Sequence, residues 1–122
     1  FNRVLTDDAI NRIRFYNNPL YLSFLRGERH YQCTAWSNPT YTVQGWREPC
    51  YPLADRHTDN VNDLFTDALW ENYGVGVNDK CANCMMHCGF ESATIYNAIS
   101  SPVGAAALVK GLITKRSGVG AP

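Results

Sequence analysis

The stretch KCANCMMHCG, residues 80–89, is the most informative part of this sequence, because it brings Cys81, Cys84 and Cys88 close together. A C-x2-C pair makes a tight turn whose two sulfurs point toward one place. If the turn continues into a helix, the three cysteines occupy positions i, i+3 and i+7 on one helical face. Such a face offers part of a binding site for a thiophilic metal.

Two further cysteines, Cys33 and Cys50, lie upstream in QCTAWSNPTYTVQGWREPC. The total of five is an odd number, which argues against a closed set of disulfides. In a chain without secretory features, clustered thiols are more often metal ligands than disulfide partners. We therefore expect Cys33 and Cys50 to complete a metal site with the C-x2-C pair. Cys88 is then a small core residue, a replacement ligand or the neighbour of a fifth ligand position.

The bulk composition is that of a folded domain. A chain of 122 residues is one domain, large enough to bury roughly two thirds of its unfolded surface. The formal net charge is zero, so no electrostatic argument favours nucleic acid or an anionic membrane as a partner. The apolar run AAALVKGLI is interrupted by Lys110 and is too short for a transmembrane segment. No signal-peptide pattern opens the chain, which starts at Phe1, so we expect a piece of a longer protein.

Caps, apolar spacing and helix breakers predict helical segments at residues 6–16, 18–27, 58–73, 84–99 and 101–115. Thr6 and Asn18 are the expected N-caps of the first two segments. In the last segment we expect Val109, Leu112 and Ile113 to face the core. The fold class is α+β, with a small β-hairpin and about four helices around a cysteine-ligated cluster.

The segment at residues 58–73 has two contrasting faces. Its apolar residues repeat with the spacing of one helical face: Val61, Leu64, Phe65, Ala68 and Leu69. Acidic residues recur every four positions on the other face: Asp55, Asp59, Asp63, Asp67 and Glu71. The acidic residues form either a solvated face or a docking surface for a basic partner domain.

The hairpin is expected between residues 31–36 and 40–46, which are rich in Thr, Tyr, Val and Trp. The Ser-Asn-Pro sequence between these segments is a turn signal, and Cys33 falls on the first strand. Gly45 supplies a backbone angle that other residues avoid. A bend after Gly45 then carries Cys50 back toward Cys33.

The cysteine spacing suits two kinds of metal site. A [4Fe–4S] cluster needs four thiolates that converge from separate segments, and a structural zinc ion takes the same four sulfurs in a tetrahedron. The preferred ligands are Cys33, Cys50, Cys81 and Cys84. The long gap between the first two cysteines is unlike a zinc ribbon, although spacing alone does not identify the metal. No phosphate-binding loop, nucleophile elbow or catalytic triad is present, so the chain carries a cofactor site and not a complete active site.

The order Cys33, eleven residues, Gly45, four residues, Cys50, and later Cys81-x2-Cys84 resembles the auxiliary-cluster pattern of twitch and SPASM domains. Those domains follow the barrel of radical S-adenosylmethionine enzymes. The phrases QCTAWSNPTYTVQGWREPCYPL and ALWENYGVGVNDKCANCMMHCGFESATIYNAISSPVGAAALVKG resemble the C-terminal domain of the hopanoid-associated radical SAM family, the adenosylhopane synthases. The resemblance extends over residues 17–111.

The resemblance implies a role for each part of the chain. The four cofactor ligands are Cys33, Cys50, Cys81 and Cys84. Cys88 matches a further cysteine of the family and is an alternative ligand. Residues 1–28 are a helical segment that joins a preceding radical SAM barrel, and residues 29–122 are the auxiliary iron–sulfur domain. Five cysteines support one [4Fe–4S] cluster, with zinc as the alternative metal.

The resemblance also implies the reaction of the parent enzyme. That enzyme cleaves S-adenosylmethionine reductively and adds the 5′-deoxyadenosyl radical to the alkene of a hopene, which gives adenosylhopane in a bacterial cell. The radical core motif C-x3-C-x2-C is absent here, and the order of spacings in Cys81-x2-Cys84-x3-Cys88 is the reverse. We therefore expect S-adenosylmethionine and its cluster to bind in the missing core domain, and this chain to be inactive alone. The expected location is the cytoplasm, with the lipid substrate as a link to the membrane.

Overall fold

Two stretches that are far apart in sequence form one unit of the structure: the residues up to Tyr31 and those from Ala93 onward. The residues from Gln32 to Ser92 form a second unit, and the boundary between the units falls within one helix. This computed structural model describes residue 1, residues 3–66 and residues 70–117. Each unit has its own set of contacts and is described by itself below.

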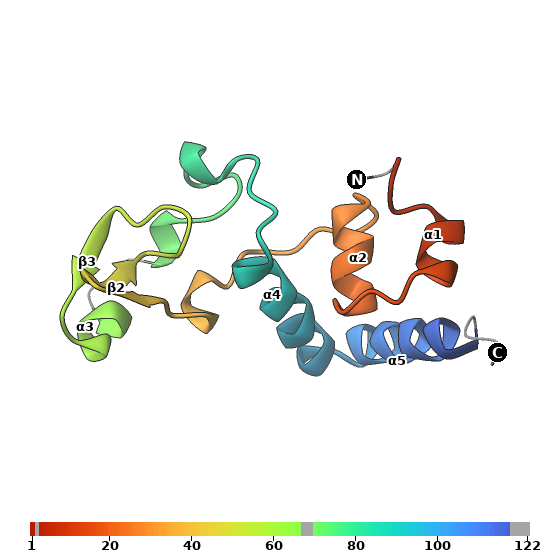
Figure 1. Ribbon diagram of the computed structural model, residues 1–122. Coiled ribbons are helices and arrows are strands. Elements are labelled where there is room, and N and C mark those ends of the chain that lie inside the picture. Colours follow the sequence, from red (N-terminus) through yellow and green to blue (C-terminus); the bar gives the residue numbers. More distant parts are fainter. Residues whose placement is uncertain (2, 67–69, 118–122) are drawn as a thin grey trace. The chain divides into compact units, whose positions relative to one another are not determined.

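The first unit is helical (Figure 1). Its helices are α1 (Asp7–Arg12), α2 (Pro19–Leu25), the larger part of α4 (His87–Ser100) and α5 (Pro102–Ser117). The predicted N-caps are confirmed, because Thr6 Oγ1 accepts the N–H of Ala9 at 3.2 Å and Asn18 Oδ1 accepts the N–H of Tyr21 at 3.0 Å. Each side chain satisfies one of the backbone donors that a helix leaves unpaired at its start.

Helix α2 provides most of the core of this unit, with Leu20, Tyr21, Leu22 and Phe24 all buried. Helix α5 packs against α2 through Gly111, where an added Cβ would lie 2.7 Å from the Cβ of Pro19.

The outward face of α5 differs from the expectation, because Val109, Leu112 and Ile113 are exposed. Close packing at Gly111 turns a face of small residues toward α2, and the larger residues therefore point away. No helix in the described ranges combines the length and the apolar character needed to cross a bilayer.

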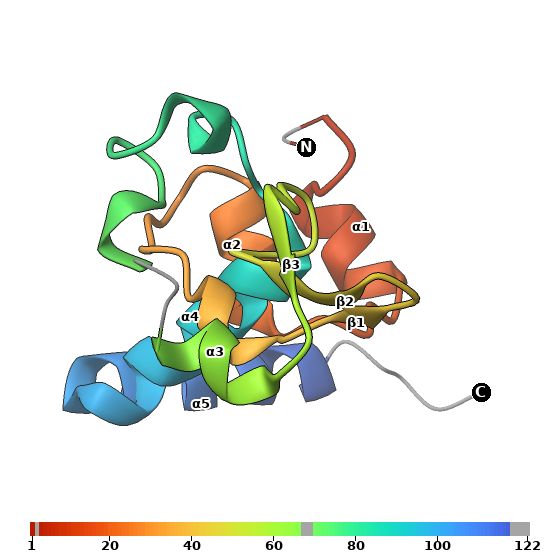
Figure 2. The same cartoon turned by 90° about the vertical axis from the view of Figure 1, so that its left-hand side faces the viewer.

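The second unit contains a three-stranded antiparallel sheet in the order β1 (Tyr41–Thr42), β2 (Gly45–Glu48) and β3 (Arg56–Thr58). Figure 2 shows the three strands side by side, with α3 (Val61–Thr66) following β3. With five α-helices and this sheet among the described residues, the fold is mixed α+β, as predicted. The hairpin occurs later in the chain than expected, since β1 pairs with β2 through Thr42 and Gly45.

The prediction of a strand at residues 31–36 is wrong. Residues 29–34 are irregular, and the short 3₁₀ helix η1 (Ala35–Ser37) follows them. Thr34 and Ser37 direct their hydroxyls to partners in the first two turns of α4, at Gly89 and Ser92. Side-chain hydrogen bonds of this kind compete with the ladder of a sheet. Cys33 therefore lies on a loop held against a helix.

Gly45 has the unusual backbone angle that the sequence predicted, but the bend expected directly after it is wrong, because residues 45–48 form β2 and the chain reverses only after Cys50. The φ of +112° at Gly45 lies in a region that residues with a Cβ rarely adopt, and an added Cβ would lie 2.6 Å from the carbonyl oxygen of Thr58. This close approach allows β2 and β3 to pair, with Trp46 opposite Thr58.

The prediction of one helix over residues 58–73 is wrong at both ends, because Thr58 belongs to β3 and the 3₁₀ helix η2 covers Trp70–Asn72, while α3 covers Val61–Thr66. Ala68 and Leu69 of the predicted apolar face lie outside the described residues. Asp67, one of the predicted acidic set, lies outside the described residues. Asp55 and Asp59 precede α3, and Glu71 belongs to η2, so these acidic residues do not share one helical face.

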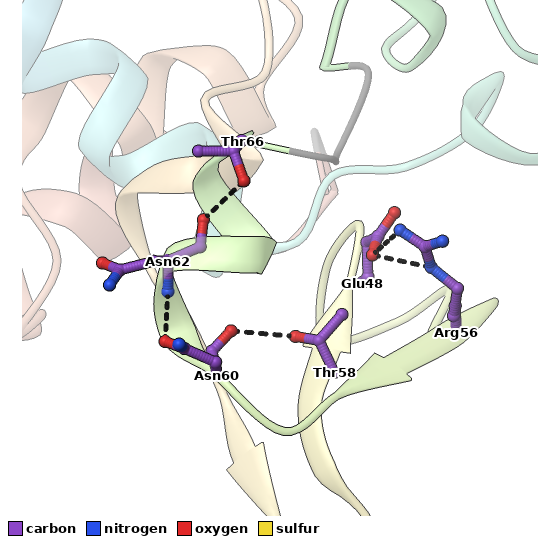
Figure 3. A network of polar contacts seen from close by, with 6 residues as sticks. All are labelled: Glu48, Arg56, Thr58, Asn60, Asn62 and Thr66. Atoms are coloured by element: carbon purple, nitrogen blue, oxygen red, sulfur yellow. Dashed lines mark hydrogen bonds and ion pairs between the residues drawn. The ribbon is translucent and has the colours of Figure 1, made fainter.

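A polar network connects the sheet to α3 (Figure 3). Asn60 Oδ1 accepts the N–H of Asn62 at 2.9 Å and starts the helix, and Thr66 Oγ1 donates to the carbonyl of Asn62 at 3.0 Å. Between β2 and β3, Nε and Nη2 of Arg56 donate to Oε2 of Glu48 at 2.9 and 2.7 Å. The Glu48 side chain is 9% exposed, so this pair supplies the charge partner of a buried carboxylate.

Candidate metal centre

Four thiols line a common cavity of about 290 Å³ in the second unit: Cys33, Cys50, Cys81 and Cys84. They come from three separate segments of the chain. Most of the remaining wall is apolar or aromatic and includes Trp36, Pro49, Pro52, Leu53, Trp70, Tyr73, Val75 and Phe90. The four cysteines that the sequence selected as ligands are therefore gathered around one space with little polar surface.

Local turns place the thiols of the C-x2-C pair. Asn78 caps the short 3₁₀ helix η3 (Asp79–Cys81), and its Oδ1 accepts the N–H of Lys80 at 3.0 Å. The N–H of Cys84 then donates to the carbonyl of Cys81 at 3.0 Å, which closes the expected turn. The chain leaves this turn in an irregular segment at residues 84–86, before α4 begins. The turn does not continue directly into a helix, so the condition under which the three downstream cysteines would share one helical face is not met.

Cys50 and Cys33 approach the cavity from different elements. Cys50 lies just beyond the end of β2, where its carbonyl accepts the N–H of Ala54 at 3.0 Å and the chain reverses direction. Cys33 lies on the loop before η1, and its sulfur packs directly against Gly89 in the first turn of α4. Gly89 is a site residue that the sequence patterns did not single out. Its position next to Cys88, inside a segment predicted to be helical, was the available signal.

Cys88 occupies the second position of α4 and is half-buried. It is not among the residues that line the cavity. Its thiol is nevertheless near enough to those of Cys33 and Cys50 to raise their pKa values. All five cysteines, each in the described part of the chain, are free thiols in one neighbourhood.

Burial makes three of the thiols, those of Cys33, Cys50 and Cys88, hard to ionise because it raises their pKa values. It raises the pKa of Cys33 to about 12, and the charges of the other four cysteines add to the effect. Burial also raises the pKa of Cys50, against a backbone hydrogen bond from Leu53 that lowers it. The pKa of Cys88 is raised by burial and by Cys84. A metal that binds here must displace protons, since thiolates are the ligating form.

The donor set is one of sulfur atoms, which favour a thiophilic metal. In a tetrahedral zinc site, Zn–S bonds of about 2.3 Å hold the sulfurs about 4 Å apart. Within the described ranges, no group of three or more His, Cys, Asp or Glu side chains is close enough to hold a metal ion. Thiolate sulfur suits both an iron–sulfur cluster and a zinc ion, so the donor set alone does not separate the two metals.

A charged pair lies at the cavity. Lys80, which lines it beside Cys81, donates from Nζ to Oδ1 of Asp55 at 2.8 Å. The ion pair holds a positive charge near thiols that become negative when they bind a metal. Asp55, which the sequence placed in an acidic face, thus has a specific partner.

Comparison with known families adds one finding. Residues 1–108 match the family described as a domain of unknown function, DUF3463. The chain belongs to this family. The match includes all five cysteines, so the cysteine-lined cavity lies inside the DUF3463 domain. No match was found among curated proteins or among solved structures.

Proposed function

We propose that this DUF3463 chain is the C-terminal auxiliary domain of a radical SAM enzyme and that it holds one [4Fe–4S] cluster. The proposed ligands are Cys33, Cys50, Cys81 and Cys84. The observation that carries the proposal is the common cavity that these four thiols line. Iron–sulfur clusters are held by thiolates from several segments and are protected by apolar surroundings, and both features are present at this cavity.

The chain's own residues have separable roles in this proposal. The four thiols give up their protons and bind iron, and the aromatic and proline side chains limit access of water. When bound, the cluster supplies ligation energy that stabilises the fold and a centre able to exchange one electron. Lys80 stands beside the ligands with its charge paired to Asp55.

The proposed parent reaction consumes two electrons and one proton from a reductant. One electron cleaves S-adenosylmethionine into methionine and the 5′-deoxyadenosyl radical. This radical forms a carbon–carbon bond with the alkene of a hopene. The resulting carbon radical takes up the second electron and the proton, equivalent to a hydrogen atom, and gives adenosylhopane. These steps belong to the core domain, because this sequence lacks C-x3-C-x2-C. We propose a cytoplasmic enzyme that meets its lipid substrate at the membrane.

Anaerobic reconstitution of the 122-residue chain tests the cluster. We expect about four iron and four sulfide per chain and a brown chromophore. Alanine variants of Cys33, Cys50, Cys81 and Cys84 should each lose the cluster. One zinc ion per chain and no sulfide uptake would instead identify a zinc-stapled interaction module, the alternative function.

The longer gene product tests the enzyme assignment. Protein that includes the core domain is incubated with hopene, S-adenosylmethionine and dithionite, and the lipids are analysed by mass spectrometry. We expect a product heavier than hopene by one 5′-deoxyadenosyl group and one hydrogen. A gene without a C-x3-C-x2-C motif upstream of this domain would contradict the assignment.

A further inference from the structure

The sulfur of Cys33 occupies space that only a glycine at position 89 leaves open. An ideal Cβ built on Gly89 would overlap Sγ of Cys33, and it would also contact Cβ of Cys33 and the backbone nitrogen of Ala35, each at 3.8 Å. Gly89 is buried in the first turn of α4. Glycine is disfavoured inside helices relative to alanine, so this close approach gives a physical reason for its presence.

The carbonyl of Gly89 also accepts hydrogen bonds from Thr34, the residue after Cys33. The backbone N–H of Thr34 donates to the Gly89 oxygen at 3.1 Å, and Oγ1 of Thr34 donates to it at 3.0 Å. Thr34 is 8% exposed, so water competes little for these bonds. One residue of α4 therefore contacts the Cys33 sulfur and also anchors the adjoining backbone.

Two serines extend this attachment. Oγ of Ser37 donates to the carbonyl of Thr34 at 2.6 Å, and it lies 2.5 Å from Oγ of Ser92, whose hydroxyl can donate to it. The hydroxyls of Thr34 and Ser92 are also 3.3 Å apart. These hydrogen bonds join two segments 55 or more residues apart in sequence. They hold the Cys33 loop against the helix turn that carries Cys88.

We propose that Gly89 is a positioning residue for Cys33, and that Thr34 fastens the Cys33 loop to it. The need for positioning follows from the sequence, because the C-x2-C turn places two thiols locally whereas Cys33 has no cysteine nearer than Cys50. Holding the thiol at the cavity before metal binds lowers the conformational entropy lost when the site closes. The consequence for the cluster rests on the function proposed above, whereas the contact between Gly89 and Cys33 is a property of the metal-free chain.

A double-mutant cycle on the metal-free chain tests the contact. Gly89→Ala should lower the midpoint of urea unfolding in the parent sequence. The loss should be largely absent in a Cys33→Ala background, because removal of the sulfur makes room for the new methyl group. Gly111→Ala is the matched control. It also forces a Cβ into a closed contact, with Pro19, but Gly111 belongs to the first unit, whereas all five cysteines belong to the second.

Iron release from the reconstituted chain tests the consequence. Loss of a residue that orients a metal ligand typically weakens metal binding by about 10- to 100-fold. We therefore expect the Gly89→Ala variant to lose iron to a chelator at least about tenfold faster than the parent chain, and Gly111→Ala to lose it at the parent rate. Thr34→Val removes the hydroxyl but keeps the backbone hydrogen bond and the side-chain shape, and it should also speed iron release. It provides the test if Gly89→Ala does not fold.

The outcomes separate the two proposals. Additive unfolding effects in the cycle, or parent-like iron release from both the Gly89 and Thr34 variants, would overturn the positioning role and leave the proposed function intact. A parent chain that binds no cluster would overturn the proposed function, and the cycle would then decide whether Gly89 positions the Cys33 thiol.

Discussion

In the folded, metal-free protein, the thiol of Cys33 should react with an alkylating reagent far more slowly than in the unfolded chain. The thiolate is the reacting species, so the rate follows the fraction of thiol that is ionised. Burial and the neighbouring cysteines raise the pKa of Cys33 from 9.0 to about 12. At pH 8 the thiolate fraction therefore falls from about one in ten to about one in ten thousand.

This difference corresponds to a rate about a thousandfold lower in the folded state. The thiol is half-buried and lines a cavity, so solvent screening reduces the effect, and we expect a ratio of at least about a hundred. Pulse labelling with iodoacetamide, followed by mass spectrometry of the peptide that contains Cys33, measures the rate. The same peptide labelled in guanidinium chloride is the reference. A ratio below about ten at pH 8 would refute the reasoning.

The raised pKa of Cys33 also makes the free energy of unfolding of the metal-free protein depend on pH. The unfolded chain releases the Cys33 proton near pH 9, whereas the folded protein keeps it until about pH 12. Between these values the folded state binds more protons, so the free energy of unfolding of the metal-free protein should fall as the pH rises. The raised pKa values of Cys50 and Cys88 act in the same direction. Urea unfolding between pH 8 and pH 10 should show this decrease, and a Cys33→Ala variant should show a smaller one.

Three further predictions concern stability, each measured by urea unfolding. Arg56→Ala should lower the free energy of unfolding by about 2 kcal/mol, because it leaves the buried Glu48 carboxylate unpaired. Glu48→Gln should lower it by only about 1 kcal/mol, because Arg56 is 56% exposed and can be hydrated. Equal losses in the two variants would contradict this reasoning. Leu64→Ala should cost about 2–5 kcal/mol, since Leu64 is 1% exposed and its truncation leaves a cavity in the second unit; a loss below about 1 kcal/mol would contradict its burial. Asn18→Ala should cost about 1–2 kcal/mol, since it removes the N-cap of α2, whereas Asn18→Ser should retain most of the stability.

Elements with local signals were predictable from the sequence. Thr6 and Asn18 cap α1 and α2 as expected, because capping depends only on residues a few positions apart. Gly45 has the unusual backbone angle that the sequence predicted, because a positive φ is a conformation that glycine alone adopts readily. The mixed α+β class follows from such local features together with the apolar patterns.

Features that depend on distant partners were not predictable. The segment around Cys33 has strand-like composition, yet Thr34 bonds to Gly89, which lies 55 residues away, and no strand forms there. The inward face of α5 was misassigned because the contact of Gly111 with Pro19, and not the size of Val109, determines which face packs. The cysteines illustrate both cases. The C-x2-C turn was predictable because it depends on neighbouring residues, whereas the loop conformation that brings Cys33 to the cavity depends on distant residues of α4 and was not.

The central claim is that four thiols of this domain hold one iron–sulfur cluster. Mössbauer spectroscopy of the chain reconstituted anaerobically with ⁵⁷Fe and sulfide tests it most directly, because the spectrum reports the ligands and the coupling of every iron atom. We predict the signature of a [4Fe–4S] cluster in which the iron atoms have sulfur coordination, and its loss in the Cys33→Ala and Cys84→Ala variants. A spectrum of isolated iron with oxygen or nitrogen ligands, unchanged by these substitutions, would contradict the account.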